Sequence, residues 1–397
     1  MPTAQQHLDQ AKAYLEAKRI ELAESELRQA IKLDPKLLEA RIELARLLGS
    51  SNRLQECESL IDEALSEEPD NPDLLTLKGM VTIGKQDFDQ AMKYLRRALD
   101  KAPKNIYALI HLGIALRETD RLDESEATLR KALAINQKSA HALLELAHTL
   151  AVKNQDSDAI RVLLQLIKVH PNFVRGYIAL AGIYRYSNRL DDAIKICHQC
   201  LSLNQNALDA AELLRDLYRQ KREYASALHV QNQICERRGS AADYVELGHL
   251  AYSANRMELA ERSYKRAASV DEDAWQPHCA LAELYAATDR LQEAMREFEE
   301  ALRLNENSHE PHNSFAIFLI NHGRLEDAIY QLDQAVKLAP EEPAVLYNRG
   351  LALAKAKRLV EAYDSISKAL QKTPPGELRN QMAETLIAIE NERRTSP

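Results

Sequence analysis

The chain has 397 residues, a formal net charge of -8 at pH 7, and only 11 glycines and 13 prolines. Abundant Ala, Leu, Glu and Arg together with so little Gly and Pro favour helices over sheets. The acidic balance and the absence of any basic run of five or more residues argue against general binding to nucleic acid, which requires a basic surface.

The beginning of the chain, "MPTAQQHLDQAKAYLEAKRIE", has no basic region followed by an apolar stretch, so it does not resemble a signal peptide. The longest apolar stretches, such as "YALIHLGIAL", are too short to span a bilayer. Five cysteines are few and odd in number, which fits a reducing compartment better than a disulfide framework. These features predict an all-helical cytoplasmic protein without a membrane span.

From residue 23 onward, the pattern Ala-x-x-x-apolar-x-x-Ala recurs along the chain, as in "AESELRQA" at 23–30 and "AIYQLDQA" at 328–335. Successive copies begin 34 residues apart, except for one interval of 33 between Ala227 and Ala260. The copies begin at Ala23, Cys57, Ala91, Ser125, Ala159, Ala193, Ala227, Ala260, Ala294, Ala328 and Ala362. This register predicts eleven tandem repeats over residues 4–376, and we number each repeat so that the leading residue is place 20.

Each repeat carries a second apolar pattern upstream, as in "YIALAGIY" at 177–184. Apolar residues at i, i+3, i+4 and i+7 in both halves predict two amphipathic helices per repeat. The turn between them contains residue types that end helices in a left-handed conformation: Asn52, Asp120, Asn188, Asn255, Asp289 and Gly323. A proline often separates one repeat from the next: Pro35, Pro69, Pro103, Pro171, Pro340 and Pro374.

After "TPPG", residues 377–394 predict a final helix with one apolar face, formed by Leu378, Met382, Leu386 and Ile389. A lone helical hairpin cannot bury its apolar stripe, so stacked hairpins share a core and the ends of the array need caps. The final segment is therefore expected to be a C-terminal capping helix.

This pattern resembles the tetratricopeptide repeat, and the resemblance covers nearly the whole chain. It implies an all-α fold, a right-handed superhelical α-solenoid of helical hairpins with the capping helix at its end. It also implies that the first helix of each hairpin lines a concave groove and the second lies outside. Because the same repeat serves many unrelated partners, the resemblance indicates the fold far more specifically than the function.

Repeat seven departs from the pattern. Place 8, where the two helices of a hairpin approach closely, is Ala or Gly in ten repeats and Arg215 in this one. The same repeat ends in "CERRG", lacks the closing proline and is shorter by one residue. Two interpretations stay open: local variation, or a bend or looser joint at residues 208–240.

The groove is expected to be lined by places 2, 5, 9 and 12 of each first helix. From repeat three to repeat six these places are largely apolar, with three arginines, two histidines and one acid. An exposed apolar strip with charges usually marks a binding site, and an extended peptide or amphipathic helix of a protein partner is the natural ligand. The predicted partner-binding residues are Met80, Tyr107, Ile110, Ile114, Arg117, His141, Leu144, His148, Arg175, Ile178 and Arg185. The alternative is that some of them pack between adjacent first helices.

The sequence contains few motifs that could indicate catalysis, redox activity or metal binding. Cys197 and Cys200 form a C-x-x-C motif, but they occupy the inward places that Leu95 and Ala98 hold in repeat three, so we expect two core thiols. A zinc site would need two further ligands. His141 and His148 stand about 10 Å apart along one helix, too far to share a metal. With no phosphate loop, no evident nucleophile and no room for a catalytic domain, we expect no catalytic residue, no metal, no cofactor and no enzyme activity.

The sequence thus predicts a protein–protein interaction scaffold that binds a peptide or helix of a partner and assists complex assembly or localisation. One alternative is a regulatory or chaperone-like adaptor subunit of a dedicated enzyme or of a secretion or assembly apparatus. Another is a structural protein that associates with itself.

Overall fold

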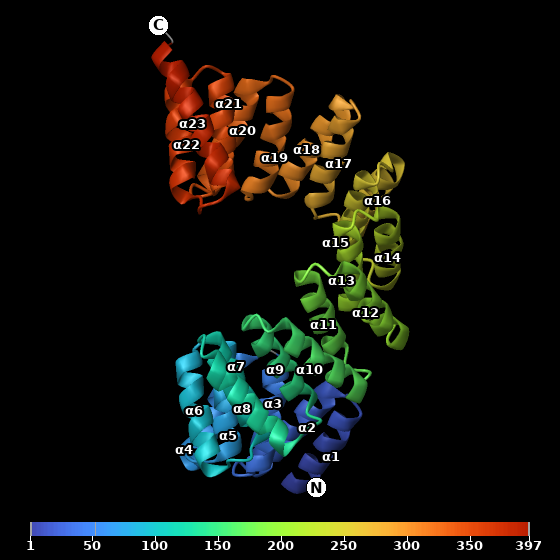
Figure 1. Ribbon diagram of the computed structural model, residues 1–397, viewed down its shortest axis with the longest axis vertical. Coiled ribbons are helices and arrows are strands. Elements are labelled where there is room, and N and C mark those ends of the chain that lie inside the picture. The colour runs from blue at the N-terminus through green and yellow to red at the C-terminus, as the bar shows by residue number, and fades with distance from the viewer. Residues whose placement is uncertain (1, 52, 396–397) are drawn as a thin grey trace. The chain divides into compact units, whose positions relative to one another are not determined.

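The computed structural model describes residues 2–51 and 53–395, and these form 23 helices with short turns and no strand (Figure 1). The predicted all-α class is therefore confirmed. The first helices of the hairpins are α1 (Ala4–Glu16), α3 (Leu38–Ser50), α5 (Pro72–Gly84), α7 (Ile106–Glu118), α9 (Ala140–Val152), α11 (Val174–Tyr186), α13 (Leu208–Gln220), α15 (Ala241–Ser253), α17 (Gln276–Ala287), α19 (His309–Asn321) and α21 (Pro343–Lys355). The second helices are α2 (Ile20–Leu33), α4 (Leu54–Glu67), α6 (Phe88–Lys101), α8 (Leu122–Ile135), α10 (Asp156–Val169), α12 (Leu190–Leu203), α14 (Tyr224–Arg237), α16 (Met257–Val270), α18 (Leu291–Leu304), α20 (Leu325–Leu338) and α22 (Leu359–Lys372), and α23 (Glu377–Thr395) follows.

The chain divides into two compact parts, which we name the N-terminal unit (residues 1–210) and the C-terminal unit (residues 211–397) and describe separately. Within each unit, neighbouring first helices contact one another, as α3 does with α5, α5 with α7, α15 with α17 and α17 with α19. Second helices make no contact of comparable extent with one another in the described residues. Because the elements inside a curved stack lie closest together, the first helices form the inner face of each unit, as an α-solenoid requires.

In nine of the eleven hairpins, a small residue at place 8 packs against a large apolar or aromatic residue at place 24. A Cβ atom added to Gly79 would lie 2.6 Å from Cγ of Leu95, and one added to Gly248 would lie 2.2 Å from the ring of Tyr264. Both distances are shorter than a contact between carbon atoms allows. The small residue therefore sets how closely the two helices of a hairpin approach.

Repeat seven replaces this pair of residues with a polar pair. The Arg215 guanidinium donates from Nη1 to Oε1 of Gln231 at 3.0 Å, and Gln231 sits at place 24 with no exposed surface. Gln231 in turn donates from Nε2 to the backbone oxygen of Asp243 at 2.8 Å. The arginine at place 8 is therefore accompanied by a matching change at the place it faces, because a buried amide requires hydrogen-bond partners.

The end of repeat seven is also rebuilt. Gly239 adopts the left-handed conformation, with φ of 63°, and Ser240 caps the following helix by accepting a hydrogen bond from the Asp243 amide. The Arg238 guanidinium contacts the buried Asp243 carboxylate at 2.5 Å. A glycine turn and an ion pair thus stand where six of the other repeats have a proline. Whether residues 208–240 form a looser joint stays a prediction.

The turns inside the hairpins follow the sequence prediction. Each turn residue named above has positive φ except Asn52, which lies outside the described residues. Four residues without a preference for this conformation also adopt it: Lys18, Gln86, Arg222 and Lys357.

The capping helix α23 packs on α22 through a narrower apolar face than predicted. Met382 and Ile389 are buried, and Leu386 packs partly against the core. Leu378 is 48% exposed, so its place in that face was predicted wrongly. It is the second residue of α23, in the first turn of the helix. In the second helix of repeat six, Cys197 and Cys200 are 2% and 1% exposed, which confirms that both are core residues.

Candidate functional site

Two adjoining cavities of about 160 and 480 Å³ open on the inner face of the N-terminal unit. They share Arg46 of α3 and Leu77 and Met80 of α5, so together they form one hollow across α3, α5 and α7. The sequence-predicted residues Met80, Tyr107 and Ile114 lie in its walls.

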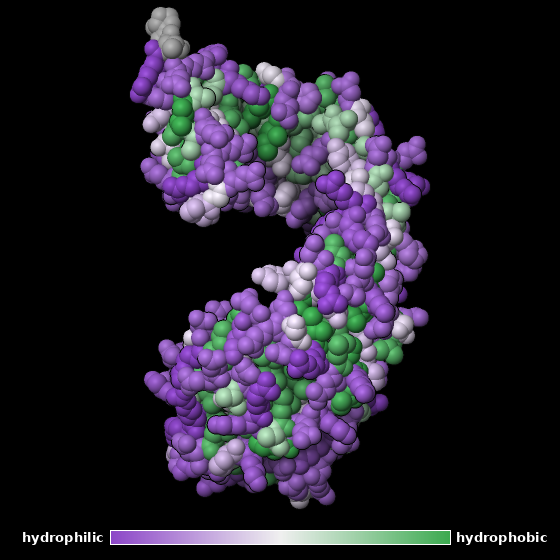
Figure 2. Space-filling model, viewed as in Figure 1, coloured by the Kyte–Doolittle hydropathy of each residue, from purple (hydrophilic) through white to green (hydrophobic). Residues whose placement is uncertain are grey.

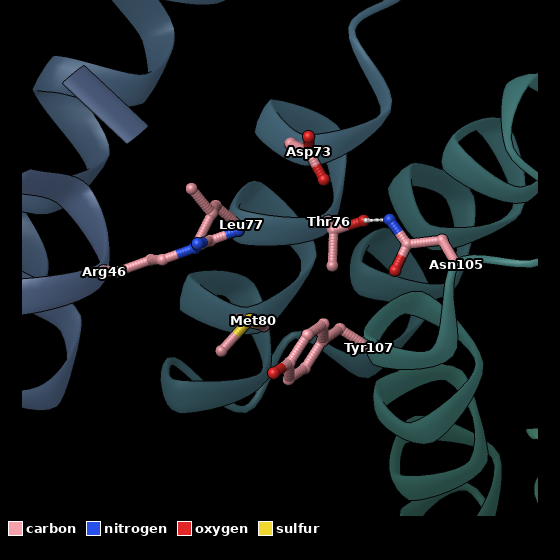
Figure 3. Close-up of a pocket in the computed structure, with 7 residues that line it drawn as sticks. All are labelled: Arg46, Asp73, Thr76, Leu77, Met80, Asn105 and Tyr107. Carbon is pink, nitrogen blue, oxygen red and sulfur yellow. Dashed lines mark hydrogen bonds between the residues drawn. The ribbon is translucent and has the colours of Figure 1, made fainter. Parts of the chain in front are cut away.

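The smaller cavity is shown in Figure 3, where the Tyr107 ring lies beside Met80 and Arg46 extends from the opposite wall. Asn105 positions the tyrosine: its side chain caps α7 by accepting a hydrogen bond from the Ala108 amide, and it donates from Nδ2 to Oγ1 of Thr76 at 3.3 Å. Tyr107 nevertheless remains 63% exposed. A large aromatic side chain is thus held at the rim and left available for contact, as at many protein interfaces.

The larger cavity has an apolar floor. Cys57, Leu77 and Val81 are 0%, 5% and 3% exposed, and Ile114 and His111 complete the α7 side. Burial lowers the pKa of His111, whose Nδ1 donates to the backbone oxygen of Tyr107 at 2.8 Å. A neutral imidazole keeps this side of the cavity uncharged at neutral pH. The cavity therefore suits an apolar side chain.

Arg117 is neutralised by neighbouring acids. Its guanidinium donates to Glu145 of α9 at 2.6 Å and contacts Glu118 at 3.0 Å, and His148 Nδ1 lies 3.6 Å from Glu145. Burial opposes ionisation of Glu145, but the hydrogen bonds from His148 and Arg117 outweigh it and lower the pKa of the carboxyl to about 2. Arg117 therefore organises the junction of α7 and α9 and supplies little free positive charge.

Free positive charge lies on α11. Arg175 and Arg185 are exposed and have no ion pair among the described residues. Between them, Gly182 leaves the helix surface open, since an added Cβ would meet nothing within 4 Å. Tyr186 at the end of α11 is 82% exposed, and Ile178 is half-buried. On α9, the exposed His141 packs edge-on against Phe173, with ring centroids 5.7 Å apart.

Two predicted groove residues are buried instead. Ile110 and Leu144 are 4% and 5% exposed, so neither can contact a ligand without a rearrangement of the helices. Both stand at place 5, which points toward the adjacent first helix. The prediction that Ile110 and Leu144 line the groove is therefore wrong.

The sequence reasoning also missed inner-face residues, notably His111, Glu145 and Tyr186. They occupy places 6 and 13, which follow places 2 and 9 by four residues and therefore share their helix face. Places 5 and 12 come one residue before places 6 and 13, so their side chains point about 100° away from those of places 6 and 13. A strict i, i+4, i+7, i+11 spacing from place 2 selects places 6, 9 and 13 and finds all three residues.

Metal ligands do not gather anywhere in the described part of the chain: no group of three or more His, Cys, Asp or Glu is placed to hold an ion. All five cysteines are free and buried, and burial raises the pKa of Cys57 to about 11 and that of Cys197 to about 12. Among the helices that the structure describes, none has the length and apolar content needed to cross a membrane.

Comparison with known proteins agrees with this architecture. Family models described as tetratricopeptide repeat match residues 14–81, 72–105, 245–309 and 316–377, and a model described as the tetratricopeptide repeat protein 21 C-terminal ARM domain matches 95–254. No curated protein matches the sequence.

Among solved structures, the crystal structure of yeast Tom70 is similar, with a TM-score of 0.52 and 15% identity over 98% of this chain and 96% of that one. The APC/C hetero-tetramer Cut9-Hcn1 matches with a TM-score of 0.40 and 11% identity over 95% of each chain. At these identities a likeness concerns the fold alone. The family models, which together extend from residue 14 to residue 377 with a short gap, and the stacked helical hairpins show that the chain is a member of the tetratricopeptide-repeat family.

Proposed function

We propose that the chain is a protein–protein interaction scaffold whose N-terminal unit binds an extended or helical segment of a partner protein. One observation carries the proposal: an apolar hollow of two adjoining cavities opens on the inner first helices, with Met80 in both cavities and the exposed Tyr107 at the rim. Well-formed apolar cavities with a few polar groups are where ligands bind most often.

The segment would run along the inner faces of α5, α7, α9 and α11. An apolar side chain of the partner enters the larger cavity, above Cys57 and beside Ile114. Arg175 and Arg185, which are exposed and unpaired in the described structure, contact carbonyl or carboxylate groups of the same segment. The remaining predicted contacts are those of His141, His148 and Ile178.

We also infer that the chain acts without catalysis and in the cytoplasm. Its five cysteines support the location, because all are buried free thiols, as in proteins of a reducing compartment. Binding, and assistance to the assembly or localisation of a complex, is the role that such a surface can perform.

Affinity purification of the tagged chain with mass spectrometry would identify candidate partners, whose binding is then measured with purified variants. Met80→Glu places a charge in the apolar hollow, and Tyr107→Ala removes the rim aromatic, so each should weaken binding at least tenfold, or about 1.4 kcal/mol. Tyr330→Ala is the matched control, because Tyr330 is 61% exposed on the second helix α20.

Unchanged binding of the partner to both Met80→Glu and the double variant Arg175→Glu/Arg185→Glu would show that the groove is assigned wrongly. One stable stoichiometric partner fits a scaffold, whereas recognition of many unrelated peptides would favour an adaptor. Light scattering of the purified chain would reveal self-association.

A further inference from the structure

A third cavity, on the inner face of the C-terminal unit, differs in chemistry from those of the N-terminal unit. It has a volume of about 210 Å³, and its lining comes from α17, α18 and α19 with the residue after α19: Glu283, Ala286, Phe298, Ser314, Ile317, Phe318, Asn321 and His322. The rings of Phe298 and Phe318 form an aromatic wall, with centroids 5.4 Å apart, and both are nearly fully buried. Ile317 is 40% exposed, and Figure 2 shows hydrophobic patches between hydrophilic ones over this part of the molecule.

Glu283 is an unpaired acid in this aromatic cavity. Neighbouring carboxylates of the unit are neutralised, as Glu261 is by Arg290 at 2.7 Å and Asp333 by Arg349 at 2.6 Å. Glu283 has neither an ion pair nor a side-chain hydrogen bond in the described residues. Its side chain is exposed, and the surrounding protein atoms nevertheless desolvate it enough to raise the pKa of the carboxyl. A carboxylate in such surroundings is stabilised by any cation that approaches it.

A second carboxylate lies nearby. Burial raises the pKa of Cys279 to about 12, and the charges of Glu283 and Glu310 both add to this effect, so both acids lie near this thiol at the junction of α17 and α19. Glu310 is exposed and has no ion pair among the described residues. Glu283 and Glu310 are therefore two acids without an ion pair in the described residues, and both lie near Cys279.

A further cavity of the same unit has the same sign of charge. It measures about 400 Å³ between α15 and α17, and Glu246 and Asp271 line it. Glu246 is paired with Arg219 at 2.7 Å. No Lys or Arg lines these two inner-face cavities, whereas Arg222 and Arg256 line another cavity of the unit, at the turns between its helices.

In the N-terminal unit, Arg46 lines both cavities, but it is paired with Glu43 at 2.8 Å, and Asp73 lines the smaller one. The distinguishing feature of the C-terminal cavity is therefore Glu283, unpaired in the described residues, beside an apolar wall.

We propose that the inner face of the C-terminal unit is a second docking site, for a basic segment of a partner protein, in which a Lys or Arg side chain enters the cavity between α17 and α19. The methylene groups of that side chain pack on the exposed Ile317, over the buried aromatic wall, and its charge meets Glu283. Long basic side chains combine an apolar stem with a charged head, which matches an aromatic cavity with a carboxylate in its wall. An acidic segment is rejected by like charge.

Three fluorescent peptides of 14 residues test the proposal with the whole chain: one of Leu and Lys in an amphipathic pattern, one with norleucine for every Lys, and one with Glu for every Lys. Fluorescence anisotropy should show the lysine peptide binding at least tenfold more tightly than the other two. Glu283→Gln keeps the shape of the side chain and removes its charge, and it should weaken the lysine peptide about tenfold. Glu299→Gln makes the same change of net charge at an exposed site on the second helix α18, and binding should be unchanged.

Equal affinities of the wild type and Glu283→Gln would overturn the proposal, and so would equal losses in Glu283→Gln and Glu299→Gln, which would indicate non-specific attraction to an acidic protein. Ile317→Ser removes the apolar contact without changing the charge, and it should also weaken binding of the lysine peptide. If light scattering shows that the chain dimerises and that Glu283→Gln abolishes the dimer, the occupant is a second copy and not a partner. Tyr107→Ala should leave binding of the lysine peptide intact, so failure of this proposal and failure of the N-terminal groove give different results.

Discussion

At the scale of single residues, the same residue type at the same repeat place has different properties according to its neighbours. Arg117 and Arg185 both stand at place 12 of a first helix. Arg117 is 15% exposed and bound to Glu145, whereas Arg185 is exposed and unpaired in the described residues. The partner of Arg117 is 28 residues away in the chain, on the next first helix. A sequence position therefore indicates where an arginine lies but not whether its charge is free.

The pKa of Glu145 predicts a loss of stability in acid. Its folded-state value of about 2 lies below the ordinary 4.5, so the stabilisation it supplies is complete above that ordinary value and is lost as the pH falls toward 2. With 17% of the side chain exposed, we expect a contribution of about 1–3 kcal/mol at neutral pH. Urea unfolding between pH 7 and pH 2 should show Glu145→Gln less stable at pH 7 and less sensitive to acid.

Glu118→Gln is the control for that measurement, because it removes the more exposed of the two acidic partners of Arg117. Exposed pairs contribute little, so its unfolding midpoint should stay close to that of the wild type. Parallel pH profiles for the wild type and Glu145→Gln would contradict the assignment.

The Arg215–Gln231 pair predicts strong coupling between two mutations. Arg215→Ala leaves the buried Gln231 oxygen without its donor, and Gln231→Leu leaves the guanidinium facing an apolar side chain, so each should destabilise by about 1–3 kcal/mol. The double variant recreates the small–large pair of the other repeats and should recover most of that loss. Urea midpoints of the four proteins measure the coupling, and additive losses would show that the pair is not a unit.

At the scale of elements, the 34-residue period was sufficient to predict the helices and turns, because each helix repeats one apolar stripe and each turn needs one residue with positive φ. Assignment of the inner face was less successful. Ile110 was placed in the groove because it stands at place 5, yet it is buried in a cluster with Ala132 of α8 and Ala142 of α9. How far one helix covers its neighbour depends on their packing angle, and a single sequence does not specify that angle. Leu378 was also assigned wrongly, because a period along one helix does not show where the neighbouring helix ends its contact, and Leu378 is 48% exposed.

The left-handed turn residues predict a stabilising substitution. Gln86 has φ of 65°, a conformation that strains most side chains by about 1 kcal/mol or more and that glycine adopts freely. Gln86→Gly should therefore raise the free energy of unfolding by about 0.5–1 kcal/mol, even after the entropy that glycine adds to the unfolded chain. Gly323→Ala is the reverse test: φ is 75° and an added Cβ would meet nothing, so any loss in urea stability comes from the backbone alone. Equal stability of both variants and the wild type would contradict this account.

At the scale of the whole molecule, the repeat register predicts one array, whereas the contacts divide the chain between Ala210 and Ala211, within α13. We propose eleven hairpins over residues 4–376, a capping helix at 377–394 and a joint at 208–240. The two proposed docking sites differ in the ligand they would take: an apolar or acidic segment on the N-terminal unit and a basic segment on the C-terminal unit.

The joint predicts faster amide hydrogen exchange in 208–240 than in the repeats on either side. In a linear array each hairpin is stabilised mainly by its neighbours, so a weakened repeat opens locally without unfolding the rest. Repeat seven has a partly buried Arg–Gln pair in place of an apolar contact, and an ion pair between Arg238 and Asp243 stands where six of the other repeats have a proline. Mass spectrometry of exchanging peptides should show faster exchange in residues 208–240 than in both 174–207 and 241–274. Uniform protection across the three repeats would mean that the polar pair is as effective as the apolar one, and that the departure of repeat seven is local variation.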